Sequence, residues 1–149
     1  MLAFIDFDGV THPAGPDKDL FCHVELLWQI LRACPTVEVV FSTSWRDSYK
    51  FDELVEFVTY GGGEDLENRF IGITPNLEAA GHYGRRDLEI QNWLDANNYS
   101  GPWLAIDDMT ELFNGGHQNL YVIDGEIGLT DADVINLIKR IENETITNT

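Results

Sequence analysis

Two aspartates, Asp6 and Asp8, are separated by a single residue and directly follow a short apolar run near the start of the chain. The apolar residues 2–5 predict a buried strand, and Gly9 allows the sharp turn that follows it. Burying an ionised carboxylate costs several kcal/mol unless the group is paired, hydrogen-bonded or bound to metal. The pattern therefore predicts a cation at this strand end, and we expect Mg²⁺.

The D-x-D-G sequence is short and common, and taken alone it favours a solvated acidic loop. An EF-hand calcium loop is excluded by spacing, because Thr11 stands where that loop requires glycine. The metal interpretation depends on partners elsewhere in the chain. Asp107 and Asp108 follow a second apolar run, and Ser42 and Thr43 follow a third, so the chain offers such partners.

Apolar runs and helical stripes alternate along the chain and would position these residues. We expect strands at 2–5, 37–41, 69–73, 103–106 and 120–123, and helices at about 20–31, 46–59, 85–96 and 130–142. This alternation predicts an α/β protein, a single three-layer, Rossmann-like domain with a mostly parallel five-stranded sheet. Ligands of such sheets bind beyond the carboxyl ends of the strands, where all the polar residues named above lie.

The composition is that of one globular domain of 149 residues with a formal charge of −17. Such a charge opposes a grip on extended nucleic acid, because the surface repels phosphates. No apolar run is long enough to span a bilayer, and Asp6 and Asp8 interrupt the start before a signal peptide could form. We therefore expect a cytoplasmic protein with no membrane partner, a domain at 1–142 and a flexible tail at 143–149.

The order of these residues resembles the haloacid dehalogenase-like (HAD) phosphatase superfamily over nearly the whole chain. Its four motifs are similar, in order, to Asp6-Phe7-Asp8-Gly9-Val10, Ser42, a basic residue at Arg85 or Arg86, and Asp107-Asp108. More narrowly, the sequence Ser-Thr-Ser-Trp-Arg at 42–46 and the R-x-x-E-I pattern at 86–90 resemble small HAD domains linked to RNA-repair proteins. The superfamily usually has lysine at its third motif, and we favour Arg86 for that position, with Arg46 as a second candidate for binding substrate.

The resemblance implies a Mg²⁺-dependent phosphomonoesterase. Asp6 would be the nucleophile that forms an aspartyl-phosphate, and Asp8 the general acid and base whose backbone carbonyl binds the metal. The other metal ligands would be the carboxylates of Asp6 and Asp107 and, through water, Asp108. The phosphate-binding residues would be Ser42, Thr43 and Arg86, although a turn hydrogen bond at the strand end is an equally good interpretation of Ser42.

The intervals between motifs are filled by the expected helices and strands, which leaves no room for a cap domain. An uncovered site predicts a bulky phosphorylated substrate, such as a nucleic-acid end or a phosphoprotein, or a neighbour in an oligomer that acts as lid. A rival hypothesis is a catalytically silent HAD-like module whose acidic surface binds a protein partner. We expect the loop residue His12 to be a bystander and Trp45 to serve packing.

Overall fold

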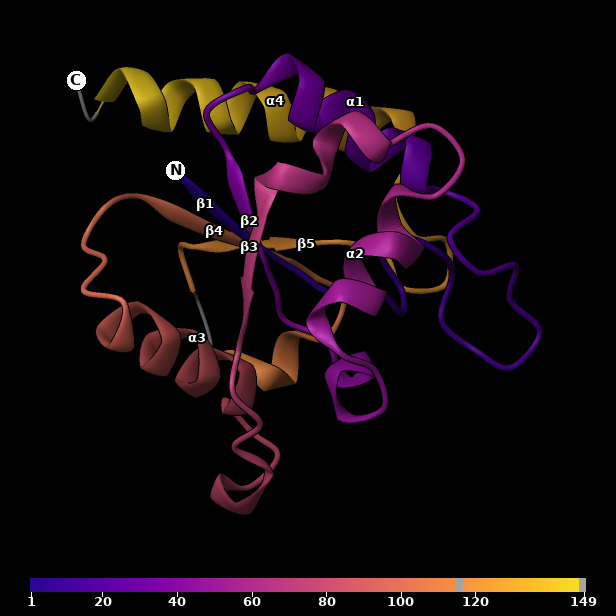
Figure 1. Ribbon diagram of the computed structural model, residues 1–149. Coiled ribbons are helices and arrows are strands. Elements are labelled where there is room, and N and C mark those ends of the chain that lie inside the picture. Colours follow the sequence, from indigo (N-terminus) through magenta and orange to yellow (C-terminus); the bar gives the residue numbers. More distant parts are fainter. Residues whose placement is uncertain (115–116, 148–149) are drawn as a thin grey trace.

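The computed structural model describes residues 1–114 and 117–147. Within them, five parallel strands form one sheet in the order β3-β2-β1-β4-β5 (Figure 1). The strands are β1 (Leu2–Ile5), β2 (Glu38–Phe41), β3 (Phe70–Ile73), β4 (Trp103–Asp107) and β5 (Leu120–Val122). The predicted α/β class and parallel sheet are confirmed, and each strand lies within two residues of its expected bounds.

Helices cover both faces of the sheet. Successive side chains of a strand point to opposite faces, so an apolar strand has side chains to bury on each face. On β1, Ala3 and Ile5 join the larger core beneath α1 (Val24–Ala33), α2 (Phe51–Thr59) and α4 (Asp131–Thr147). Leu2 and Phe4 join the smaller core beneath α3 (Arg85–Ala96). Figure 1 shows α1 and α4 together on one side and α3 on the other, so the predicted three layers are confirmed.

The register of the central strands aligns the predicted site residues. Strand β1 lies between β2 and β4, and Ile5 pairs with Phe41 on one side and with Ile106 on the other. The next residues along these strands are Asp6, Ser42 and Asp107. Three polar side chains that are far apart in sequence therefore meet at one edge of the sheet.

Two predicted helices differ from the structure at their starts. The helix expected from Leu20 begins at Val24, and Leu20 is 50% exposed. Residues before it turn back to the first loop, where the backbone N–H of Phe21 donates to the His12 ring and that of His23 donates to the Thr11 carbonyl. The helix expected at 46–59 is divided into a short 3₁₀ turn, η1 (Ser44–Asp47), and α2.

The last helix begins as predicted and runs further than predicted. Thr130 caps it, since the Asp133 backbone N–H donates to the Thr130 hydroxyl at 3.2 Å. It extends to Thr147, so residues 143–147 of the expected tail are helical, while 148–149 lie outside the described residues. A domain boundary at residue 142 stays a prediction.

The segments that join the motifs contain the helices and strands already named, short 3₁₀ turns and loops. Within the described ranges no separate cap domain is evident, as predicted. The described part of the chain also holds no helix with the length and apolarity that a membrane span requires.

Candidate active site at the carboxyl edge of the sheet

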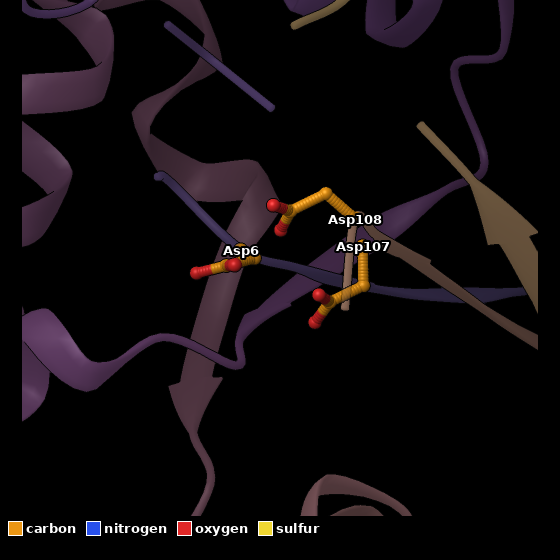
Figure 2. Close-up of side chains that lie close together, drawn as sticks. All are labelled: Asp6, Asp107 and Asp108. Atoms are coloured by element: carbon orange, nitrogen blue, oxygen red, sulfur yellow. The ribbon is translucent and has the colours of Figure 1, made fainter. Parts of the chain in front are cut away.

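Three carboxylates meet beyond the ends of β1 and β4. Asp6 follows β1, Asp107 ends β4, and Asp108 comes next; one oxygen of each lies within 4.8 Å of the others (Figure 2). Asp6 and Asp107 are each only 2% exposed. The parallel register has therefore brought together the acids that the sequence predicted at strand ends.

A single cation bridges two of these carboxylates. The Nη1 atom of Arg86, in the first turn of α3, donates to Asp6 Oδ2 and to Asp107 Oδ2, both at 2.7 Å. Arg86 is 5% exposed, so these charge-assisted bonds lie out of water. Of the two arginines considered from the sequence, the structure places Arg86 on the carboxylates.

One arginine does not offset three neighbouring acids, two of which are buried. Burial, reinforced by the charge of Asp107, raises the pKa of Asp6 to about 7, although Arg86 opposes this shift. Burial likewise raises the pKa of Asp107 to about 6, and burial with the charge of Asp6 raises that of Asp108 to about 6. The cluster favours either protons or a further cation.

The donor set fits Mg²⁺, which prefers hard carboxylate oxygens. Oδ1 of Asp108 is buried and has no hydrogen-bond partner among the described residues. Two glycines let this side chain approach, because a Cβ atom added at Gly9 or at Gly125 would lie 2.3 Å from Asp108 Oδ2. The sequence indicated only a turn at Gly125, and its contact with Asp108 became visible in the fold.

Asp8 lies outside the carboxylate cluster and is held by three donors. Its Oδ1 accepts from Lys18 Nζ at 2.5 Å and from His12 Nε2 at 2.9 Å, and its Oδ2 accepts from Trp45 Nε1 at 3.1 Å. Burial alone would raise the pKa of Asp8, but these hydrogen bonds outweigh it and lower the pKa below its usual range. Asp8 is therefore held as an oriented, ionised carboxylate.

Two expectations about this network were wrong or incomplete. His12, expected to be a bystander, is fully buried and contacts Asp8. Its Nδ1 accepts the backbone N–H of Phe21 at 3.1 Å, so the neutral ring carries its proton on Nε2 and donates it to Asp8. The Trp45 ring does pack on Phe7, with centroids 5.5 Å apart, but its N–H also donates to Asp8.

The hydroxyls after β2 differ from each other. Ser42 is 1% exposed, and its Oγ has no hydrogen-bond partner within the described chain, so it is available to a phosphoryl oxygen. The hydroxyl of Thr43 accepts the backbone N–H of Trp45 at 3.3 Å and thereby caps η1. Arg46, the second candidate for substrate, pairs with the buried Glu89 at 2.5 Å.

Comparison with known families decides the relationship of the chain. Residues 2–134 match the sequence model of the family described as the HAD domain in Swiss Army Knife RNA repair proteins. The chain belongs to this family. Searches of curated proteins and of solved structures gave no match.

All of the predicted site residues of this HAD domain lie inside the matched segment. The contacts that the sequence did not reveal come from residues that reach Asp8 or Asp108 only in the fold: His12, Lys18, Trp45 and Gly125. A weak signal existed for the first two, because both follow Asp8 in the same loop. Nothing in the sequence placed Trp45 or Gly125 at the site.

Proposed function

We propose that this HAD domain is a Mg²⁺-dependent phosphomonoesterase that works through an aspartyl-phosphate on Asp6. The observation that carries the proposal is the buried Asp6 at the centre of an acidic cluster, bridged to Asp107 by Arg86. Membership of the HAD superfamily, whose domains are usually phosphohydrolases, supports it. A purely structural site would have little reason to gather three mutually repelling carboxylates, two of them buried.

The metal would be held by Asp6, Asp107, Asp108 and the backbone carbonyl of Asp8. When bound, Mg²⁺ would reduce the repulsion between the Asp6 carboxylate and a phosphate dianion. Arg86 and the free hydroxyl of Ser42 would bind phosphoryl oxygens, and arginine suits this because its planar fork matches two oxygens at once.

The reaction would take place in two steps. With the negative charge of the substrate phosphate beside it, Asp8 would hold a proton at the start of the first step. A carboxylate oxygen of Asp6 attacks phosphorus and the bond to the alcohol oxygen breaks, while Asp8 gives that oxygen its proton. Water then attacks the aspartyl-phosphate, Asp8 takes up a proton from it, and inorganic phosphate leaves as the Asp6 carboxylate is restored. The position of Asp8 beside the acidic cluster, rather than in it, supports this division of roles.

The open site supports a bulky substrate. No cap domain is evident in the described residues, and the family is linked to RNA repair, so a phosphorylated nucleic-acid end is a suitable substrate class, with a phosphoprotein as the alternative. Such substrates keep most of their surface outside the site and present only a terminal phosphate.

The substitution Asp6→Asn tests the nucleophile. It keeps the size of the side chain but removes the carboxylate, so hydrolysis of an aryl phosphate in millimolar Mg²⁺ should fall below detection. Circular dichroism should show an unchanged fold. Full activity in this variant would exclude Asp6 as the nucleophile.

The rival function is a silent module that binds a protein partner through its acidic surface. A cavity of about 660 Å³ between α2 and the 3₁₀ turn η2 (Glu64–Arg69) is lined by Asp52, Glu56, Glu64 and Glu67, which suits a basic partner.

Thermal melts with and without Mg²⁺ separate the two functions. A metal-binding site should stabilise the fold by about 2.7 kcal/mol at a hundredfold excess over Kd. No shift, together with no phosphatase activity, would favour the silent module.

A further inference from the structure

A second group of cationic side chains lies directly beside the candidate active site. Arg46, Arg85 and Arg86 all line one cavity of about 210 Å³, together with the polar side chains of Ser44 and Asn76. Arg86 also contacts Asp6, so the cavity borders the place where a phosphoryl group would bind. A chain with only nine Lys and Arg residues has thus gathered three of them here.

Two guanidinium groups in this cavity have unused donors. The side chain of Arg46 is only 8% exposed, and its Nε has no hydrogen-bond partner among the described residues. The nearby Asp47 Oδ1 is 3.9 Å away, too far for a hydrogen bond. Nε of Arg85 is likewise buried and unpartnered. Buried donors without acceptors are costly, so two of them beside one cavity indicate a ligand that carries acceptor oxygens.

The positive charge available to an anion in this cavity is that of Arg85. Arg86 is offset by Asp6 and Asp107, and Arg46 by Glu89, but Arg85 forms no ion pair within the described part of the chain. Two acids, Asp47 and Glu78, also line the cavity. Asp47 accepts from the Asn76 amide at 2.8 Å. Arg85 opens the helix α3, whose dipole adds positive potential at that end.

We propose that this cavity binds a second phosphate of the substrate, adjacent to the terminal phosphate that Asp6 attacks. The inference rests on the proposed phosphatase function. Arg46 and Arg85 would donate to the oxygens of this second group, with Ser44 and Asn76 completing the contacts. A strand end of nucleic acid carries such a group in its last internucleotide phosphodiester.

An exposed aromatic residue favours a nucleotide over a phosphopeptide. Tyr83 is 85% exposed and stands two residues before Arg85, next to Gly84, the N-cap residue of α3. Its ring makes a T-shaped contact with His82, with centroids 5.5 Å apart, and most of the residue's surface stays accessible to a base. Stacking on an aromatic ring is how many proteins hold single-stranded nucleic acid.

The test compares substrates that differ by one phosphodiester. Uridine 3′- and 5′-monophosphate are measured against the dinucleotides UpUp and pUpU, which carry the same terminal phosphates. Either UpUp should have a higher kcat/KM than uridine 3′-monophosphate, or pUpU should have a higher kcat/KM than uridine 5′-monophosphate. The expected increase is roughly 10–100-fold, which corresponds to the free energy of one hydrogen bond to a charged group. Arg85→Gln should bring this ratio close to one. Arg46→Lys, which keeps a charge for Glu89 but lacks Nε, should lower it in part.

Matched substitutions elsewhere control for charge and for aromatic surface. Arg32→Gln removes an arginine at the far end of α1, where it pairs with Asp65, and should leave the ratio intact. Tyr83→Ala should reduce the ratio, whereas Tyr60→Ala, which removes a tyrosine of similar exposure after α2, should not. Equal kcat/KM for mononucleotides and dinucleotides would overturn the second subsite.

Binding measurements separate this inference from the phosphatase proposal. The Asp6→Asn domain is titrated with the same nucleotides, so the affinity ratio is obtained without turnover. Absence of turnover with Arg85-dependent tighter binding of a dinucleotide would leave the subsite standing and reject the phosphatase. Turnover by the unsubstituted domain, together with equal affinities of the Asp6→Asn domain for mononucleotides and dinucleotides, would support the phosphatase and reject the subsite. An Arg85-dependent gain seen only with a doubly phosphorylated peptide would overturn the assignment to nucleic acid.

Discussion

Asp6 and Asp8 stand two residues apart, yet their surroundings are opposite. Asp6 is buried beside two other acids, and its pKa is raised to about 7. Asp8 is partly exposed and accepts three hydrogen bonds, and its pKa is lowered. Asp6 shares one arginine with Asp107, whereas Asp8 has a lysine and two neutral donors to itself.

The different surroundings of Asp6 and Asp8 indicate which charged species each carboxylate would bind. The cluster around Asp6 gains most from a divalent cation, which would relieve the repulsion of three carboxylates. Asp8 is prepared as a base, and it would gain a proton only when the negative charge of a phosphate arrives, since a like charge raises the pKa of a carboxyl. Substitutions that change only one of the two carboxylates or its partners test this difference.

The largest contrast should come from Asp8→Asn and Asp107→Asn. Asp8→Asn should lower kcat by roughly 10²–10⁴-fold, because proton transfer is lost, with little change in Mg²⁺ affinity. Asp107→Asn should weaken Mg²⁺ binding strongly, because a side-chain ligand is lost. Isothermal titration with Mg²⁺ and aryl phosphate kinetics measure both. If Asp8→Asn loses the metal and Asp107→Asn keeps it, the two roles are reversed.

The second contrast concerns stability and pH without metal. Carboxyls whose folded pKa is raised stabilise the fold at low pH, and this contribution is lost as pH rises from about 4 through the folded value of about 7. The melting temperature in EDTA should therefore fall between pH 5 and about pH 7.5, and Mg²⁺ should restore it.

Asp6→Asn should make the melting temperature less dependent on pH, because it removes the carboxyl group with the highest pKa in the cluster. Asp95→Asn, on the exposed side of α3, is the matched control and should retain the slope. A slope unaffected by Asp6→Asn would show that general surface repulsion, rather than the buried cluster, causes the pH dependence.

The smallest contrast comes from one donor to Asp8. Trp45→Phe keeps an aromatic ring against Phe7 but removes the N–H that orients Asp8, so kcat should fall about tenfold with KM nearly constant. Trp28→Phe is the matched control, because the Trp28 N–H donates to the Val58 carbonyl within the core. That substitution should lower the melting temperature without changing kcat; an equal loss of kcat in both would reduce the role of Trp45 to packing.

Local sequence predicted the elements where the pattern was long or strongly apolar. Helix α3 occupies the expected residues 85–96, with Gly84 before its first residue and with Ile90 and Leu94 buried as predicted. The expected start of α1 at Leu20 failed, because Phe21 and His23 donate their backbone N–H groups to the first loop instead of entering the helix. The apolar helical pattern extended one turn before Val24, to Leu20, but hydrogen bonds to the first loop kept this turn out of the helix.

The sequence by itself determined the parallel α/β fold and the acids at strand ends, because both follow from periodicity and from the cost of burying charge. Tertiary structure alone decided which groups surround each acid. The order of strands placed Asp6 beside Asp107, and the folding of loops brought His12 and Trp45 to Asp8. The contact of Trp45 joins residues 37 positions apart, which local spacing cannot predict, and the short interval from Asp8 to His12 gave only a weak signal.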